Sequence, residues 1–181
     1  DIYGLLGVNG SGKSTTLRIL LTLISPDNGD IRIFGKTLHK NQQNIKRNIG
    51  ALIERPDFYP YLTAYKNLEL LLKYAGHQPS RHRIREVLDL VGLSKFTSKR
   101  VGIFSQGMKQ RLGIAQAVIH DPELIILDEP VNGLDPHGLV DIRKLIMKLN
   151  RELGKTIILS SHILREVELI ANRMLVIHEG K

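Results

Sequence analysis

Short apolar runs alternate along the chain with longer stretches in which apolar residues recur every three or four positions. The short runs are bounded by turn residues and predict strands at residues 2–6, 31–34, 49–53, 124–127, 156–159 and 174–177. The longer stretches predict helices at residues 13–24, 63–75, 80–91 and 105–119, and another from about residue 163. A further helix is indicated by the core-facing stripe Ile142, Leu145, Ile146, Leu149 and Leu153. This alternation predicts an α/β fold in which helices flank a mostly parallel sheet.

The middle of the chain departs from the simple alternation. Residues 54–62 are rich in Pro and Tyr and predict a loop. The helices that follow it have Thr63, Ser80 and Ser105 at positions where an N-cap is expected. We therefore expect a single domain over residues 1–181, interrupted by a helical insert at about 56–115.

Composition narrows the class of protein. The 181 residues include no cysteine, which excludes disulfide bonds and thiolate metal sites. A hydrophobic content of 42% is typical of a globular domain with a sizeable core. No apolar run approaches the roughly 18–20 residues that a membrane-spanning helix requires.

The net charge of +8 is compatible with nucleic acid, an anionic membrane surface or a polyanionic substrate such as ATP. Much of this charge lies in residues 56–115, which contain ten Lys and Arg residues and four acidic residues. We expect most of these charges to form a solvated helical surface. No aromatic-rich motif is interleaved with them, so no nucleic-acid partner is expected.

Residues 7–14 fit the phosphate-loop pattern G-x-x-x-x-G-K-[ST], between a predicted strand and a predicted helix. Glycines let the backbone curl around phosphates, and the N–H groups at a helix N-terminus attract negative charge. Lys13 would place its charge on the β- and γ-phosphates, and the Ser14 hydroxyl would ligate Mg²⁺. The expected nucleotide-binding residues are Gly7, Val8, Asn9, Gly10, Ser11, Gly12, Lys13, Ser14 and Thr15.

Two acidic residues, Asp128 and Glu129, follow the apolar strand predicted at 124–127. In a phosphate-loop enzyme the first acid holds Mg²⁺ through its water shell. The second can act as the general base that polarises the attacking water. Small GTPases would instead carry an Asn-Lys-x-Asp guanine reader, which this sequence lacks.

The order of further motifs resembles that of ABC ATPases over the whole chain. Residues 104–108, Phe-Ser-Gln-Gly-Met, stand where that family has its Leu-Ser-Gly-Gly-Gln signature, at the start of a helix. Residues 132–135, Asn-Gly-Leu-Asp, follow the carboxylates as the family's D-loop does. His162 follows a strand at the position of the family's switch histidine.

This resemblance implies a head-to-tail dimer in which each ATP lies between the phosphate loop of one subunit and the signature of the other. It implies that Ser105, Gln106, Gly107 and Met108 act in trans at the γ-phosphate, and that Asp135 acts across the dimer interface. Glu129 and His162 would be the catalytic pair, with ATP and Mg²⁺ as the cofactors. The partners implied are a second nucleotide-binding domain, identical or not, and the transmembrane permease subunits. The permease would hold the protein peripherally on the cytoplasmic face of the membrane.

The sequence departs from the family pattern in a few places. Gln106 and Met108 replace a glycine and the glutamine of the signature, and Glu54 replaces the glutamine that opens the Q-loop. Because Glu54 occupies the position of that glutamine, the resemblance implies that it lies near the metal ion, together with Ser14 and Asp128. The family's adenine-stacking aromatic residue would precede residue 1, and residues 179–181 would lead into a further strand, so the resemblance implies a chain truncated at both ends.

Around two of these departures the sequence is similar to that of one subgroup of ABC proteins. Residues 105–115, Ser-Gln-Gly-Met-Lys-Gln-Arg-Leu-Gly-Ile-Ala, and the stretches 53–56 and 58–63 resemble bacitracin- and lantibiotic-type antibiotic exporters. This predicts a subunit that uses ATP to energise export of an antibiotic or lantibiotic-like peptide. The alternatives are a non-transport ABC ATPase acting on ribosomes or DNA, and a degenerate nucleotide-binding regulator. Retention of Lys13, Asp128, Glu129 and His162 together argues against the degenerate regulator.

Overall fold

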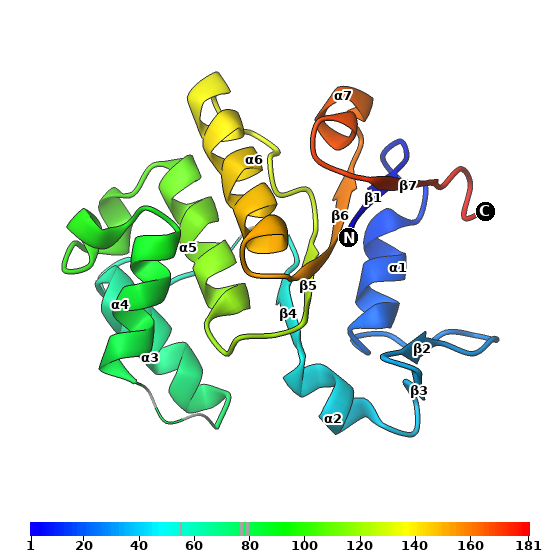
Figure 1. Cartoon of the computed structure of the whole chain (residues 1–181), viewed down its shortest axis with the longest axis horizontal. Helices are drawn as coiled ribbons and strands as arrows, with labels where there is room; N and C mark the ends of the chain where they lie inside the picture. The colour runs from blue at the N-terminus through cyan, green and yellow to red at the C-terminus, as the bar shows by residue number, and fades with distance from the viewer. Residues whose placement is uncertain (55, 77, 79) are drawn as a thin grey trace.

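A computed structural model describes residues 1–54, 56–76, 78 and 80–181. Within those residues, five strands form one sheet in the order β4-β5-β6-β1-β7, and each neighbouring pair is parallel (Figure 1). The strands are β1 (Ile2–Leu6), β4 (Ile49–Leu52), β5 (Leu124–Leu127), β6 (Thr156–Ser161) and β7 (Arg173–Val176). A separate antiparallel pair joins β2 (Arg32–Ile33) to β3 (Lys36–Thr37). The sheet is therefore the expected parallel one.

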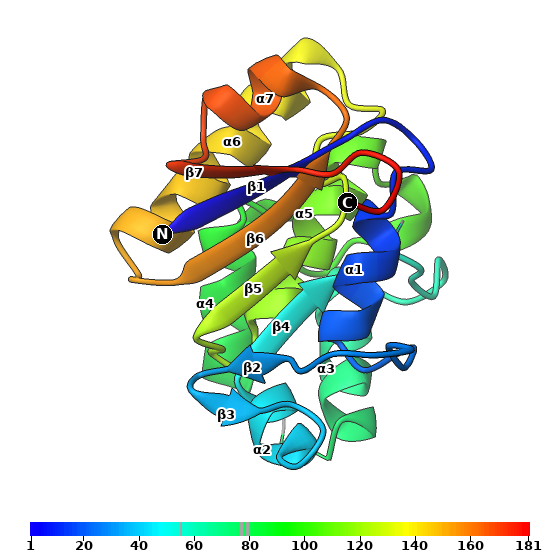
Figure 2. The ribbon, with the colours of Figure 1, turned by 90° about the vertical axis from the view of Figure 1, so that its right-hand side faces the viewer.

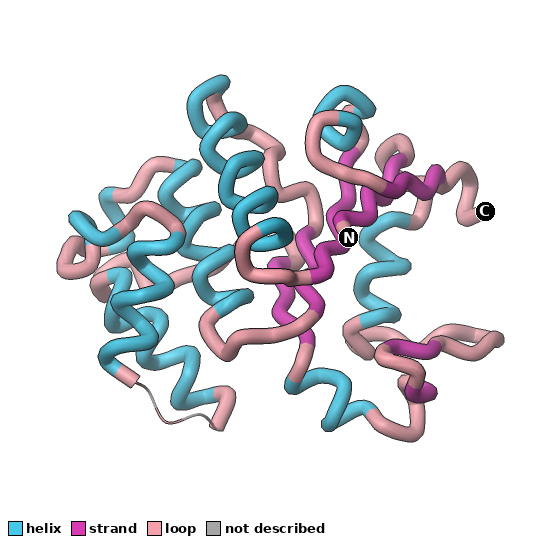
Figure 3. Tube along the Cα trace, in the orientation of Figure 1, coloured by secondary structure: helices cyan, strands magenta, loops and turns pink. Residues whose placement is uncertain are grey.

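Helices cover both faces of this sheet. They are α1 (Lys13–Leu20), α2 (Gln42–Arg47), α3 (Ala64–Tyr74), α4 (Arg81–Leu90), α5 (Gln106–Val118), α6 (Pro136–Arg151) and α7 (Leu164–Glu168), with short 3₁₀ turns at Ser94–Phe96 and Val101–Ile103. Figures 1 and 2 show α1 on one face of the sheet and α5 and α6 on the other. Figure 3 shows that α3, α4 and α5 gather at one end of the molecule. No helix among the described residues is long and apolar enough to span a bilayer.

The strand β5, which lies between β4 and β6, is buried on both faces, as is typical of a parallel sheet. Its side chains alternate between two apolar clusters. Ile125 and Leu127 belong to the cluster that packs beneath α5 and α6, whereas Leu124 and Ile126 pack with Leu17 of α1. The acidic residues that follow β5 are thus anchored at the end of the most buried strand.

Two expectations about helix ends are wrong. The first helix stops at Leu20 rather than continuing to residue 24, because Thr22 has a left-handed φ of 56° that no continuing helix can accommodate. Leu153 is not a core residue. It lies beyond the end of α6 and is exposed, since the chain turns at Gly154 with φ 67°.

Two further differences lie between α1 and β4. The strand expected at 31–34 is reduced to β2, because Phe34 and Gly35 have φ of 53° and 71° and reverse the chain into β3. The helix α2 was not expected from the sequence. Its six residues bury only Ile45, so it has no apolar period from which it could be recognised.

Candidate nucleotide site

The phosphate loop joins β1 to the start of α1. Gly7 is the position where only glycine fits, because a Cβ there would lie 2.4 Å from the Ile177 carbonyl oxygen and from Ser11 Oγ. Gly12 is the N-cap of α1 with φ 109°, a conformation that L side chains rarely adopt. These two glycines set the curve of the loop and place the first turn of α1, which carries Ser14 and Thr15, at its end.

Lys13 lies inside this curve and is only 5% exposed. Its ammonium group donates hydrogen bonds to the carbonyl oxygens of Gly7 at 2.8 Å and Val8 at 3.1 Å. The same nitrogen is 3.7 Å from Oε1 of Glu129. A buried positive charge is thus fixed at the centre of a glycine-rich loop, which is an arrangement suited to an anionic group.

Glu129 connects this charge to the next strand of the sheet. Strands β5 and β6 run parallel with Leu127 opposite Leu159, so the residues after both strands emerge at one edge. Oε2 of Glu129 lies 2.9 Å from Nδ1 of His162. Three residues that the sequence analysis singled out separately, Lys13, Glu129 and His162, therefore form one contiguous chain of polar contacts.

A cavity of about 210 Å³ opens at this place. It is lined by Asn9, Gly10, Gly12, Lys13, Ser14, Thr15, Glu129 and Asn132. Most of these residues belong to the predicted phosphate loop. Asn132 belongs to the D-loop stretch, and its place at the pocket is not evident from the sequence. Its proximity follows from the turn in which its N–H donates to the Glu129 carbonyl oxygen at 3.1 Å.

The signature residues lie at the start of α5. Ser105 is the N-cap, and its hydroxyl accepts a hydrogen bond from the Met108 N–H at 3.2 Å. Met108 is partly buried against the main apolar cluster, so its side chain contributes packing where glutamine would contribute polar contacts. Gly107 lies beside Leu134 of the D-loop, and a Cβ at Gly107 would be 4.0 Å from the leucine side chain. Gln106 is half-buried.

The signature and the phosphate loop belong to opposite faces of the sheet. Figures 1 and 2 place α5, which the signature begins, on the face away from α1, which the phosphate loop begins. The cavity described above is lined by residues of the phosphate loop and of the 129–132 turn. The exposed Ser105 hydroxyl group therefore lies outside the cavity formed by the chain's own phosphate loop.

Asp135 and Glu54 have partners of their own. Oδ1 of Asp135 accepts the Gly138 N–H at 2.7 Å and caps α6, which gives this residue a structural role within the chain. The Glu54 carboxylate forms an ion pair with the guanidinium of Arg18. Arg18 was not singled out from the sequence, but it follows Ser14 by four positions on α1 and so shares a helix face with it.

The motifs that build this site also match a known family. The family model described as ABC transporter matches residues 1–132, which include the phosphate loop, the signature and both acids after β5. The chain belongs to the ABC transporter family.

Relatives within this family are similar over nearly the whole chain. The bacitracin transport ATP-binding protein BcrA of Bacillus licheniformis is 54% identical over 181 residues, which are 100% of this chain and 59% of that protein. The lantibiotic transport ATP-binding protein SrtF of Streptococcus pyogenes is 44% identical over 180 residues, which are 99% of this chain and 76% of that protein. The resemblance to the bacitracin and lantibiotic subgroup is thereby confirmed.

A solved structure confirms the fold class. The dimeric post-hydrolysis state of the ATP-binding cassette MJ0796, bound to ADP and Pi, is similar with a TM-score of 0.85 and 29% identity. The similarity covers 99% of this chain and 82% of that one. The ABC chain described here therefore has the fold of P-loop NTPases, and membership of the family implies that it binds a nucleotide.

Proposed function

We propose that this ABC domain binds MgATP and hydrolyses it as one half of a dimer. The observation that carries the proposal is the position of Glu129, whose carboxylate lies between the Lys13 ammonium at 3.7 Å and the His162 ring at 2.9 Å. A carboxylate at the border of a phosphate-binding cavity can accept a proton from an attacking water. The lysine on one side and the histidine on the other orient that carboxylate.

The oxygen atoms near this carboxylate fit a magnesium ion. Mg²⁺ prefers hard oxygen ligands and retains several waters, and it is usually bound by one or two protein groups together with phosphates. Ser14 lines the cavity, and Asp128 is 5% exposed at the end of β5. These two residues would hold the ion. When bound, Mg²⁺ would neutralise part of the negative charge on the phosphates.

The remaining residues of the loop would bind and orient the substrate. Backbone N–H groups at the start of α1 would donate to the phosphates, and Lys13 would exchange its carbonyl partners in the loop for phosphate oxygens. His162 would donate to the γ-phosphate. Release of inorganic phosphate from MgATP by the purified protein tests this assignment, and its absence under conditions that support nucleotide binding would overturn it.

A second copy of such a domain would complete the site. The signature residues Ser105, Gln106 and Gly107 lie at the start of α5, on the face of the sheet away from α1. This position supports the proposal that they cap a nucleotide held by a partner. MJ0796 is dimeric in its post-hydrolysis state. We therefore assign the partner's signature to the γ-phosphate, and Asp135 to the interface in addition to its capping of α6.

The relatives' names favour transport over action on ribosomes or DNA. BcrA is named for bacitracin transport and SrtF for lantibiotic transport. This chain spans 59% of the length of BcrA, so substrate and partners are part of the proposal. We propose that the domain energises the export of an antibiotic or lantibiotic-like peptide. It would do so peripherally, on the cytoplasmic face of the membrane, through permease subunits.

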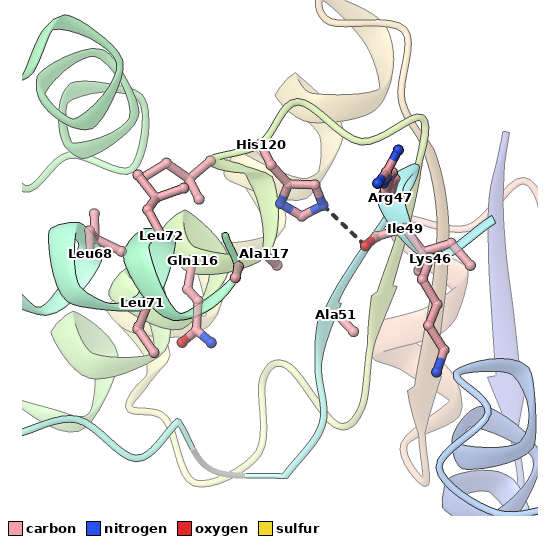
Figure 4. Close-up of a pocket in the computed structure, with 12 residues that line it drawn as sticks. Lys46, Arg47, Ile49, Ala51, Leu68, Leu71, Leu72, Gln116, Ala117 and His120 are labelled. Carbon is pink, nitrogen blue, oxygen red and sulfur yellow. Dashed lines mark hydrogen bonds between the residues drawn. The ribbon is translucent and has the colours of Figure 1, made fainter. Parts of the chain in front are cut away.

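The permease would dock in a groove between α3 and the segment from α2 to β4. One cavity of about 350 Å³ is lined by Leu68, Leu71 and Leu72 of α3 and by Lys46 and Arg47 of α2 (Figure 4). A second, of about 420 Å³, is lined by residues of the loop before α3, such as Pro56 and Asp57. The two cavities share Lys46, Ile49, Ala51 and Gln116, so they form one groove. This groove adjoins the loop at residues 54–62, of which residue 55 lies outside the described residues.

Three aromatic residues of that loop divide into two kinds. Phe58 packs against the main apolar cluster and anchors the loop. Tyr59 and Tyr61 are 40% and 65% exposed, with ring centroids 5.8 Å apart. The buried Asn67 of α3 holds this end of the loop, since it accepts the Tyr59 N–H at 2.9 Å and donates to the Tyr59 carbonyl oxygen at 3.1 Å. The loop therefore presents two tyrosine rings from a fixed backbone.

Replacing Tyr59 and Tyr61 together with alanine is expected to lower transport by about tenfold or more, because exposed aromatic residues at an interface carry much of its binding free energy. Basal ATP hydrolysis should remain within about twofold of wild type. The comparison is transport against phosphate release in vesicles that contain the complete transporter. Phe58→Ala serves as the contrasting variant and should lower the thermal unfolding temperature. Loss of stability or of basal hydrolysis in the double tyrosine variant would show that these rings are structural.

Glu54 is proposed to lie near Mg²⁺ when ATP is bound. Its carboxylate pairs with Arg18 on the helix face that carries Ser14. A carboxylate is a harder ligand than an amide oxygen, and next to bound ATP it would add a negative charge that Mg²⁺ would offset together with Arg18. Productive closure should therefore depend more steeply on Mg²⁺ than it would with glutamine.

In Glu54→Gln we expect the midpoint of a Mg²⁺ titration of ATP hydrolysis to shift by about threefold or more, with a shallower dependence, at saturating ATP. Glu152→Gln, which removes an exposed carboxylate after α6, is the matched control and should leave the titration unchanged. An unchanged midpoint and turnover in Glu54→Gln would remove this residue from the vicinity of the metal.

A further inference from the structure

A buried hydroxyl group on β6 connects the two acidic residues that follow β5. Ser160 is fully buried, with 0% of its surface exposed. Its Oγ donates a hydrogen bond to Oδ1 of Asp128 at 2.5 Å. The same oxygen accepts the backbone N–H of Glu129 at 2.8 Å. One side chain thus contacts both acids, and it was not singled out from the sequence.

The second of these hydrogen bonds acts on an unusual backbone conformation. Glu129 has φ 46°, in the left-handed region that non-glycine residues rarely adopt. Such conformations persist when the surrounding structure determines them, and they gather at functional sites. Here the Glu129 N–H is held by Ser160, and its carbonyl oxygen accepts the Asn132 N–H at 3.1 Å. These two bonds fix the peptide on both sides of Cα.

The backbone conformation of Glu129 decides where its side chain points. With the peptide held by Ser160, the carboxylate reaches Lys13 Nζ at 3.7 Å and His162 Nδ1 at 2.9 Å. If the peptide relaxed towards an ordinary φ, the direction of the Cα–Cβ bond would change and both contacts would move. Displacements of about 1 Å at a reacting group can cost about 10²-fold in rate.

We propose that Ser160 is a positioning residue for hydrolysis: its single hydroxyl holds the Asp128 carboxylate and the strained Glu129 peptide in one fixed relation. The inference rests on the proposed ATP hydrolysis and assigns no contact between Ser160 and the nucleotide. A hydroxyl group suits the role because it donates once and accepts at the same oxygen. An apolar side chain would leave a buried carboxylate oxygen and a backbone N–H without this partner, and such unpaired groups are costly.

The neighbouring Ser161 offers a matched control. It is also on β6 and 1% exposed, but its hydroxyl accepts the Ile163 N–H at 3.0 Å, and within the described part of the chain it forms no hydrogen bond with Asp128 or Glu129. Removing either hydroxyl deletes one buried oxygen from the same strand. A difference between the two variants therefore measures what the contacts to Asp128 and Glu129 contribute.

The experiment compares wild type, Ser160→Ala, Ser160→Cys and Ser161→Ala in the full-length protein. We expect Ser160→Ala to lower kcat by about tenfold or more, with the KM for ATP within about threefold of wild type, because a positioning defect acts on the chemical step. Ser160→Cys should lose activity similarly, since it fills the same space but forms weaker hydrogen bonds. The decrease in kcat caused by Ser161→Ala should be at least about fivefold smaller than the decrease caused by Ser160→Ala. Nucleotide affinity without Mg²⁺ should be close to wild type in all three variants, whereas the thermal unfolding temperature of Ser160→Ala should fall because two buried groups lose a partner.

Three results would overturn the assignment. The first is a kcat for Ser160→Ala within about twofold of wild type. The second is a wild-type rate in Ser160→Cys, which would show that volume rather than hydrogen bonding matters. The third is a parallel loss of nucleotide affinity and kcat in Ser160→Ala, which would indicate a general structural role. Lack of hydrolysis by the wild type itself would instead refute the proposed function, so the two failures are distinguishable.

Discussion

Replacing Glu129 with glutamine is expected to lower the rate of MgATP hydrolysis by about 10²–10⁴-fold, the range associated with a general base. Glutamine retains the size of the side chain but cannot accept the proton from water. The contacts that bind ATP, from the phosphate loop and from the partner's signature, should survive. The variant is therefore expected to accumulate as an ATP-bound dimer, visible by gel filtration with and without MgATP.

The matched control is Glu123→Gln, which removes an exposed carboxylate just before the same strand, β5. This variant should hydrolyse ATP at the wild-type rate and should not accumulate as a dimer. If Glu129→Gln instead stayed monomeric with MgATP and still turned over, Glu129 would not be the base. The contact between His162 Nδ1 and Glu129 Oε2 at 2.9 Å would then stabilise the structure without a role in catalysis.

Replacing Lys13 with alanine is expected to remove ATP binding itself. Lys13 is the residue of the phosphate loop that carries a full positive charge, and its ammonium group is already positioned by the Gly7 and Val8 carbonyl oxygens. Charge-assisted contacts to phosphate are among the stronger hydrogen bonds in proteins. A titration with fluorescent ATP should show at least about tenfold weaker binding, which corresponds to about 1.4 kcal/mol.

Lys36→Ala controls for the loss of one positive charge, since Lys36 is an exposed lysine on β3. It should bind ATP as the wild type does. The unfolding temperature of Lys13→Ala must also be measured, because its ammonium group forms hydrogen bonds within the loop. An affinity within about threefold of wild type, about 0.7 kcal/mol, would be too small for a direct phosphate contact.

The sequence predicted most of the fold because strong periodic patterns belong to strongly buried elements. The apolar run at β5 and the stripe of α6 up to Leu149 are fully or almost fully buried. The errors concern segments where a backbone turn overrides the pattern. Leu23 and Ile24 continue an apolar period, yet the left-handed Thr22 ends α1 before them. No single-residue propensity indicates that threonine will adopt this conformation.

The candidate site divides in a similar way. Motif spacing brought out Lys13, Glu129 and His162, and the parallel arrangement of β1, β5 and β6 explains why they meet at one edge. Ser160 and Arg18 could not be singled out. Serine and arginine are common residues, and their contacts to Asp128, Glu129 and Glu54 depend on the distance between elements far apart in the sequence. Such contacts become visible only when the strands and helices are placed in space.

The central claim is that two copies of the domain form the catalytic site together, one supplying the phosphate loop and the other the signature. The most direct test is the rate of phosphate release per subunit from saturating MgATP, measured over a wide range of protein concentration, with Glu129→Gln as the blank. We predict that the rate per subunit rises with concentration and levels off once the dimer is fully formed. A rate per subunit that is the same at all concentrations, measured on protein shown to be monomeric, would contradict it.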